Sequence, residues 1–211
     1  MNPEGTPSIL EVHELNFNYP DQTLFVDLSL TVPTGISLIC GGVGLGKSTL
    51  IRLLAGALPA QSGLLRINGV DLQAQPIAYK AQIFWAEPWS TAFDELTLPD
   101  YFELQRSNHA GFDDRALTDM TEGLGLQDHL HKQLFMLSTG SKRKVFLAAA
   151  FASGAAVTLL DEPFAALDAK STGFMLLKLK RAAREGHRAF VLADFLAPDG
   201  VPLVKVIDLG D

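Results

Sequence analysis

The segment Gly41–Thr49 holds the residue types that bind a nucleoside triphosphate, in the sequence G-G-V-G-L-G-K-S-T. Glycines let main-chain N–H groups approach a polyphosphate, and the N-terminus of a following helix adds partial positive charge. Lys47 would reach the β- and γ-phosphates, and the Ser48 hydroxyl would bind Mg²⁺. We therefore expect ATP or GTP to bind here, in preference to an ordinary glycine-rich turn. The residues expected around the phosphates are Gly41, Gly42, Val43, Gly44, Leu45, Gly46, Lys47, Ser48 and Thr49.

Two acidic residues, Asp161 and Glu162, follow the fully apolar run Ala156–Leu160, which has the pattern of a buried strand. At such a strand end Asp161 can enter the Mg²⁺ shell. Glu162 can face the water that attacks phosphorus, because that water needs a general base or an orienting carboxylate. An acidic pair in this position is, taken alone, more often a plain strand terminus. We favour the catalytic interpretation because the same chain carries the glycine-rich segment.

The elements around these two motifs indicate an α/β fold. An apolar run, Ile36–Cys40, precedes the glycine-rich segment, and a helical pattern, Thr49–Leu58, follows it. The pair Asn68-Gly69 between two apolar runs predicts a two-residue hairpin turn. Residues 88–151 are mainly helical in pattern. Further strands are expected at Ile9–Tyr19, Leu24–Val32, Ile83–Ala86, Ala189–Ala193 and Val204–Ile207, and a further helix at Asp168–Arg184.

These elements predict one domain over residues 1–211, with the core of a P-loop NTPase and a mainly parallel sheet. The core would occupy about residues 8–87 and 154–211 and would include a small antiparallel β subdomain. Residues of about 88–153 would form a helical insertion subdomain between the two nucleotide motifs. A chain of 211 residues is long enough to bury a core of this kind.

Net charge and hydropathy limit the kinds of partner and the cellular location that we expect. The formal net charge is -7, whereas a sequence-independent nucleic-acid binder normally has a basic surface, so we expect no nucleic acid as a partner. The start, Met1–Gly5, lacks the pattern of a signal peptide. The most apolar long stretch, Val145–Leu160, is shorter than the roughly 20 residues that cross a bilayer. We expect a cytoplasmic protein, or one held on the cytoplasmic face of the cell membrane by a partner.

A third motif, Leu137-Ser138-Thr139-Gly140-Ser141, lies about twenty residues before the acidic pair. With it the chain resembles the ATP-binding subunits of ABC transporters, whose signature is L-S-G-G-Q at this place. The resemblance covers Ile9 to Leu209 and includes the loop that ends in Asp168. It implies the ABC ATPase fold and the cofactors ATP and Mg²⁺. It also implies two ATP-binding chains that close head to tail, so that Ser138, Thr139 and Gly140 contact the ATP of the opposite chain.

The resemblance assigns further residues. Tyr19 stands where the family places an aromatic ring on adenine, with Phe17 as the competing ring, and Asp168 belongs to the loop near the nucleotide. The cations 142–144 fall in the first turn of a helix, where the helix dipole disfavours positive charge. A nearby anion, such as the γ-phosphate of the opposite chain, would offset that cost. The alternative is that these three cations simply form a charged face exposed to solvent. The family docks its transmembrane partner on the segment Glu87–Asp100.

Two positions depart from the family. Glu87 stands where the family has a glutamine that touches Mg²⁺ and the attacking water, and Asp194 stands where it has a histidine that binds the γ-phosphate. Glu87 can still bind Mg²⁺, but it cannot donate an amide hydrogen bond. An ionised Asp194 would repel the phosphate, since two unit charges about 4 Å apart interact by about 4 kcal/mol at a dielectric constant near 20. We therefore count Lys47, Glu87, Glu162 and Asp194 as the catalytic set. We expect either slow hydrolysis or a raised pKa on one of the acidic groups Glu87, Asp161, Glu162 and Asp194.

Three functions follow from the resemblance and its departures. The first is an ATP-hydrolysing subunit that drives a separate transmembrane transporter subunit through ATP-dependent dimerisation, as a homodimer or as a heterodimer with another ABC ATPase. The second is a regulatory ATP-binding subunit with impaired hydrolysis. A soluble ABC protein that acts on DNA or the ribosome is less favoured, because such relatives carry a long coiled coil or a second ATPase unit. A short chain and an L-S-x-G-x-K-R run also give a weak similarity to haem-exporter ATPases.

Overall fold

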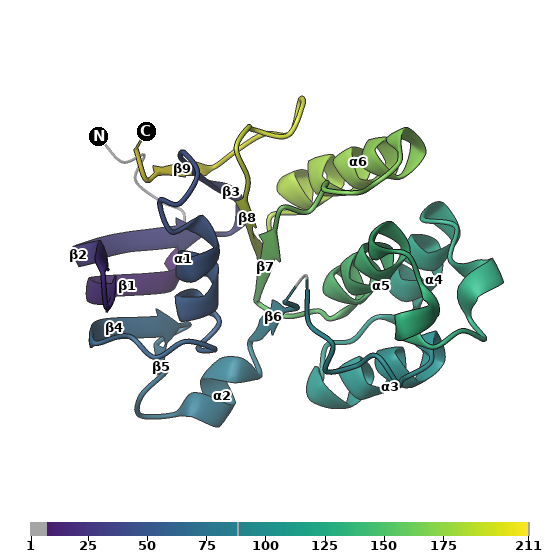
Figure 1. The fold of residues 1–211 in the computed structure, drawn as a ribbon, viewed down its shortest axis with the longest axis horizontal. Helices are drawn as coiled ribbons and strands as arrows, with labels where there is room; N and C mark the ends of the chain where they lie inside the picture. The colour runs from purple at the N-terminus through teal and green to yellow at the C-terminus, as the bar shows by residue number, and fades with distance from the viewer. Residues whose placement is uncertain (1–7, 88, 211) are drawn as a thin grey trace.

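The computed structural model describes residues 8–87 and 89–210, and it contains two β-sheets with helices between and beside them (Figure 1). The first sheet is antiparallel, with the strand order β2-β1-β4-β5. The predicted hairpin turn is present: Asn68 and Gly69 have φ angles of 49° and 77°, as a primed two-residue turn requires. The strands of this sheet are β1 (Ser8–Tyr19), β2 (Gln22–Pro33), β4 (Ser62–Ile67) and β5 (Val70–Asp71).

The second sheet is parallel in all its strand pairs and has the order β6-β7-β8-β3-β9. Its three central strands are almost wholly buried, which agrees with their continuous apolar sequences, because both faces of such a sheet are covered. The predicted fold class, with a mainly parallel sheet and a small antiparallel sheet, is therefore confirmed. The strands are β3 (Gly35–Cys40), β6 (Ile83–Trp85), β7 (Val157–Asp161), β8 (Ala189–Ala193) and β9 (Lys205–Asp208).

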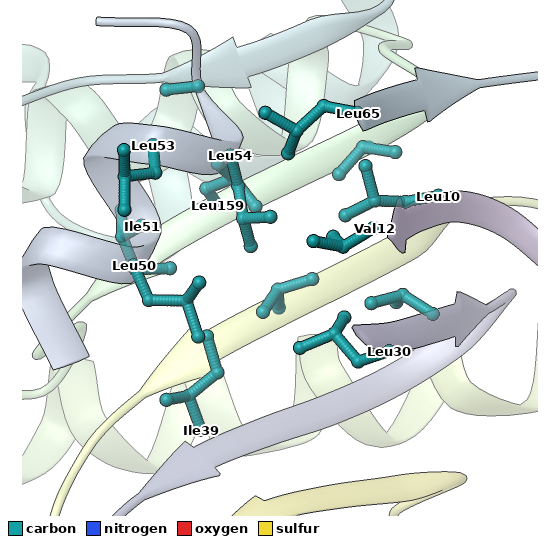
Figure 2. Packing of buried hydrophobic residues seen from close by; sticks show 14 of the residues in the cluster. Leu10, Val12, Leu30, Ile39, Leu50, Ile51, Leu53, Leu54, Leu65 and Leu159 are labelled. Atoms are coloured by element: carbon teal, nitrogen blue, oxygen red, sulfur yellow. The ribbon is translucent and has the colours of Figure 1, made fainter. Parts of the chain in front are cut away.

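Helix α1 (Lys47–Leu54) lies between the two sheets and joins them through one apolar core (Figures 1 and 2). Leu10 of β1 and Leu159 of β7 both belong to this core, together with Leu50 and other residues of α1. The helix ends at Leu54, four residues earlier than the sequence pattern suggested. The reason is Gly56, whose φ of 64° is left-handed and ends a helix readily. Because α1 is buried in this core, its first residues, directly after the glycine-rich segment, are held in a fixed position.

Four of the five remaining helices in the described part of the chain lie on the other face of the parallel sheet, around a second apolar core, whereas the fifth, Pro76–Lys80, contributes Tyr79 to the first core (Figure 1). Aromatic rings connect them: Tyr101 of α3 lies 5.5 Å from Phe146 of α5, between ring centroids. None of the helices within residues 8–87 and 89–210 has the length and apolar character needed to cross a membrane. The helices are α2 (Pro76–Lys80), α3 (Leu98–Asn108), α4 (Asp114–Gly123), α5 (Thr139–Ala152) and α6 (Ala169–Glu185), with 3-10 turns at Gln127–His129 and Leu134–Met136.

Arg188, directly before β8, fastens the end of α5 to the parallel sheet. Its guanidinium donates to the carbonyl oxygens of Ala150, Phe151 and Ala155 at 3.1, 3.1 and 2.6 Å, and to the hydroxyl of Thr158 at 2.7 Å. Burial lowers the pKa of this guanidinium to about 10. Main-chain acceptors thus satisfy a partly buried cation, and these bonds tie the end of α5 to β7.

Candidate functional site

The glycine-rich loop, residues 41–46, connects β3 to α1 with a backbone that only glycine adopts easily. Gly41 and Gly46 have φ angles of 142° and 92°, in the region that is strained for residues with a side chain. A Cβ at Gly41 would lie 3.0 Å from the carbonyl oxygen of Gly210. Gly46 is the N-cap of α1 and offers no side chain to accept hydrogen bonds from the first turn. The N-terminal N–H groups of this helix are therefore open to an anion.

The ammonium group of Lys47 lies inside the glycine-rich loop. The side chain is buried, and its Nζ donates to the carbonyl oxygens of Gly41 and Gly42, each at 2.7 Å. The ammonium also lies 4.1 Å from the centroid of the Phe195 ring, a cation–π contact. Phosphate oxygens that enter the loop would compete with these carbonyl oxygens for the same ammonium group.

Three carboxylates gather at the carboxyl end of β7 and β8, next to this loop. Asp161 is the last residue of β7 and pairs with Ala193 of β8, so Glu162 and Asp194 leave neighbouring strands at the same sheet edge. The Glu162 N–H donates to the Ala193 carbonyl at 2.8 Å. The order of strands in the sheet therefore unites residues that lie 32 to 33 positions apart in the sequence.

The pKa values of these carboxyls show how closely the loop and the acids interact. Burial is the main reason that the pKa of Asp161 is raised, and a hydrogen bond with the Ser48 side chain opposes it. Burial likewise raises the pKa of Asp194. The charge of Glu162 raises both values and that of Lys47 lowers both. Lys47, Ser48, Asp161, Glu162 and Asp194 thus form one electrostatic unit.

The oxygens of Ser48 and Asp161 are ligands of the kind that Mg²⁺ takes in proteins. Hydroxyl and carboxylate oxygens are hard ligands, and Mg²⁺ takes only one or two protein ligands while phosphates and water complete its shell. The Ser48 side chain is among the causes that lower the pKa of Asp161, so the two side chains lie close together at the start of α1. A site of this kind suits a metal that arrives with a polyphosphate.

The raised pKa of Asp194 predicts a stabilising substitution. A folded carboxyl with a raised pKa binds its proton more tightly than the unfolded chain does, so its ionisation lowers stability as the pH rises through the folded pKa. Asp194→Asn removes that ionisation and keeps an oxygen for the Phe195 N–H, which bonds Asp194 Oδ1 at 2.7 Å. We expect a higher Tm at pH 7.5 and a smaller gain at pH 4.5, measured by circular dichroism. A lower Tm at pH 7.5 would contradict the argument.

The segment 138–141 starts helix α5 and leaves its polar side chains outside. Ser138 is the N-cap, and its Oγ accepts from the Ser141 N–H at 3.1 Å. Ser138 and Thr139 are exposed. Gly140 approaches the neighbouring loop so closely that a Cβ there would lie 2.3 Å from the carbonyl oxygen of Ala166. This third motif is therefore presented on the surface, against the loop that ends in Asp168.

The lysines in the first turn of α5 have anionic partners within the chain. Lys142 forms an ion pair with Asp94 and donates to the Ser90 carbonyl at 2.7 Å, and Lys144 lies 2.6 Å from Asp168. Both lysine side chains are largely buried by these contacts. The interpretation as a solvated face is therefore wrong, and the charges no longer require a phosphate nearby. Sequence alone did not show this because Asp94 lies 48 residues from Lys142.

Asp168 forms hydrogen bonds within the chain at the start of α6. It is the N-cap, with Oδ1 accepting from the Ser171 N–H at 2.8 Å and Oδ2 bonding Lys144. The Lys144 hydrogen bond is the main reason that the pKa of Asp168 is lowered. Both carboxylate oxygens are thus used within the chain, and the expected role near a nucleotide stays a prediction.

The structure places Tyr19 at the loop and Phe17 in the core. The Tyr19 hydroxyl lies 3.3 Å from Thr49 Oγ1, and 37% of the tyrosine is exposed. Phe17 is only 7% exposed and meets Tyr19 edge to face at 5.0 Å between centroids. Of the two rings, Tyr19 therefore has the free surface for a base.

Glu87 points away from the acidic group. Its Oε1 lies 3.9 Å from Arg52 Nε, on the later part of α1, and its charge is not among the causes that shift the pKa of Asp161 or Asp194. The structure thus brings together five of the six predicted catalytic and metal residues at the loop but turns Glu87 towards a different partner. The proposed metal role of Glu87 remains a prediction.

The segment after Glu87 is only partly available for a partner. Trp89 is 69% exposed, whereas Phe93 packs against Tyr101 with 5.3 Å between ring centroids, and Leu98 is buried. Packing within the helical part of the chain therefore explains most of the apolar residues in this segment, and Trp89 is the main exposed one among those described.

Comparisons with known proteins identify the family. The family model described as "ABC transporter" matches residues 25–165. An uncharacterised ABC transporter ATP-binding protein of Sinorhizobium fredii is 32% identical over 186 residues, covering 84% of this chain and 53% of the relative. The zinc transport system ATP-binding protein TroB of Treponema pallidum is 30% identical, covering 89% of this chain and 73% of the relative. This chain belongs to the ABC transporter family, among its ATP-binding subunits.

Solved structures agree. An ATP-binding subunit of an ABC transporter superposes with a TM-score of 0.80 at 25% identity, covering 90% of this chain and 80% of that chain. A putative ABC transporter ATP-binding protein from Pyrococcus furiosus has a TM-score of 0.76 at 23% identity, covering 96% and 98%, and supports the fold alone. The predicted resemblance and the ABC ATPase fold are thereby confirmed.

Proposed function

We propose that this chain is the ATP-hydrolysing subunit of an ABC transporter and drives a separate membrane subunit. The observation that carries the proposal is the meeting of Lys47 and Ser48 with Asp161, Glu162 and Asp194 at one edge of the parallel sheet. A cation in a glycine-rich loop, an oxygen pair suited to Mg²⁺ and a further carboxylate are the parts that phosphoryl transfer from ATP to water needs.

Each of these residues has a proposed role. Lys47 and the open N–H groups of α1 would bind the β- and γ-phosphates and stabilise the charge that spreads over them during transfer. Ser48 and Asp161 would hold Mg²⁺, which neutralises phosphate charge. Glu162 would orient the attacking water and accept its proton. Tyr19 would stack on the adenine, since it is exposed beside Thr49.

The second half of the site would come from another ATP-binding chain. Ser138 and Thr139 are exposed at the N-terminus of α5, where a helix end attracts an anion. We propose that they and Gly140 contact the ATP of the opposite chain when two chains close. Residues of about 88–153 would then move as a helical subdomain relative to the core. The membrane partner would hold the complex on the cytoplasmic face of the membrane.

Several relatives carry names that support a transporter partner. Taurine import protein TauB of Escherichia coli is 32% identical, and manganese transport protein MntB of Bacillus subtilis is 30% identical. These names differ in the transported substrate. They support transport as the process that this chain energises, and we propose no particular substrate from them.

We expect hydrolysis to be slow because of Asp194. Its carboxylate lies near Glu162 and would face the γ-phosphate from β8, whereas a histidine there would donate a hydrogen bond. The single variants Asp194→His and Glu87→Gln should therefore each raise kcat, by about tenfold where about 1.4 kcal/mol of the repulsion is removed. Steady-state phosphate release measures this. An unchanged or lower kcat in both single variants would refute the expectation.

A regulatory subunit with impaired hydrolysis is the second candidate, favoured by the same acidic group and by the ion pair of Glu87 with Arg52. Comparing ATP hydrolysis with ATP-dependent dimerisation separates the two. The first function predicts both activities in the wild-type chain. The second predicts ATP-dependent association, with itself or with a more active chain, and turnover close to background.

A further inference from the structure

One buried cation, Arg143 of α5, reaches the main chain of Asp161 and Glu162. The residue is only 6% exposed. Its Nη1 donates to the carbonyl oxygen of Asp161 at 3.1 Å and also to the carbonyl oxygen of Glu162. A side chain from the helical part of the chain thus holds the backbone at the end of β7.

The backbone that it holds is strained. Glu162 has a φ of 46°, in the left-handed region, which a residue with a side chain adopts only when its surroundings fix it. Its N–H is fixed by the Ala193 carbonyl at 2.8 Å. Its carbonyl oxygen accepts from Arg143 and from the Ala165 N–H, the latter at 3.1 Å. Arg143 is the one side chain among the described residues that bonds this strained residue.

The charges around Arg143 explain why it stays ionised. Burial lowers the pKa of its guanidinium, and the charges of Glu162, Asp161 and Asp194 oppose that shift. Its Nε is buried without a hydrogen-bond partner in the described part of the chain, and the Trp89 ring lies over the guanidinium at 5.6 Å. Arg143 therefore neutralises part of the acidic group, while its directed contacts are with carbonyl oxygens.

We propose that Arg143 is a positioning residue that orients the Glu162 carboxylate for attack on ATP by fixing the backbone of Asp161 and Glu162. The proposal rests on the proposed function. Arg143 lies on the helix whose N-cap is Ser138, fewer than two helical turns away. Contact of a second chain with Ser138 would therefore act on the same rigid helix that holds Glu162. Closure and catalysis would be connected through α5.

The kinetic test separates positioning from binding. Arg143→Met should lower kcat by about 10- to 100-fold, because small misplacement of a catalytic group has effects of that size. The KM for ATP should stay within about twofold, as for a residue that acts only on the transition state. Arg143→Lys should recover part of the loss, since Lys47 shows that an ammonium can bond two adjacent carbonyl oxygens.

A second readout does not depend on turnover. Hydrogen exchange of a peptide that spans residues 161–167 should become faster in Arg143→Met without nucleotide. The Glu162 amide bonds the Ala193 carbonyl and the Ala165 amide bonds the Glu162 carbonyl, so both depend on the backbone that Arg143 holds. Arg188→Met is the matched control, because Arg188 is a partly buried arginine that also bonds main-chain carbonyls, and its pKa is shifted by burial alone. It should lower Tm but leave both kcat and the exchange of residues 161–167 unchanged.

Thermal unfolding shows which variants are folded. If Arg143→Met does not fold, Arg143→Gln keeps one amide donor and takes its place. The proposal is overturned if the folded variant keeps kcat within about twofold of the wild type. A twofold change corresponds to about 0.5 kcal/mol, which is no more than an ordinary surface substitution causes. It is also overturned if Arg188→Met reproduces the loss of kcat or if exchange is unchanged. A wild-type chain without any ATP turnover would instead overturn the proposed function itself, and this inference with it.

Discussion

Glu162→Gln should bind ATP as tightly as the wild-type chain and hydrolyse it about 10²- to 10⁴-fold more slowly. Glutamine keeps the shape of the side chain, and the contacts that fix residue 162 in the structure come from its backbone N–H and carbonyl groups. What is lost is the carboxylate that orients water and accepts its proton. ATP binding, which we assign to Lys47 and the glycine-rich loop, should remain. Steady-state phosphate release measures the rate, and calorimetry measures the affinity.

The same variant should accumulate as an ATP-bound dimer, because closure would no longer be reversed by hydrolysis. Size-exclusion chromatography with ATP and Mg²⁺ should show the dimer, and ADP should not produce it. Glu185→Gln is the control, since Glu185 is an exposed residue of α6 that pairs with Arg181. Hydrolysis by Glu162→Gln at the wild-type rate would show that another group activates the water.

Lys47→Ala should lose ATP binding. A charge-assisted hydrogen bond contributes about 1.5–3 kcal/mol, so the Kd should rise by at least about 10- to 100-fold. Fluorescence titration with a labelled ATP analogue measures the change. The substitution also leaves the carbonyls of Gly41 and Gly42 without their present donor, so Tm must be measured in parallel.

Lys80→Ala provides the matched control for this experiment, because Lys80 is an exposed lysine on α2, away from the glycine-rich loop. It should leave the ATP affinity unchanged. Equal affinities in a folded Lys47→Ala variant and in the wild type would show that Lys47 does not bind phosphate.

The local motifs were predictable from sequence because each is a short run with its own physical requirement. Glycines before Lys47 gave the loop, apolar residues before Asp161 gave β7, and Asn68-Gly69 gave the hairpin turn. The family resemblance then supplied the fold, which the comparisons confirm. Helix α1 ends earlier than the helical pattern Thr49–Leu58 predicts, because Gly56, with its left-handed φ, terminates it.

Contacts between distant segments were not predictable in the same way. The sequence does not reveal that β7 and β8 are neighbours, which is what brings Asp194 to Glu162. Nor does it show that Lys142 pairs with Asp94. Arg143 stood in a run of three cations with nothing in its type or spacing to distinguish it. Its role became visible only once α5 was placed against the end of β7.

Titration calorimetry of the wild-type chain with ATP and Mg²⁺ tests the central claim most directly. The structure predicts a saturable heat with one nucleotide for each chain, through the phosphate-binding residues that begin α1. In the Lys47→Ala chain, studied under identical conditions, this heat should disappear. If the folded wild-type protein gives no saturable signal, the claim that the glycine-rich loop binds ATP is wrong, whatever the variants show.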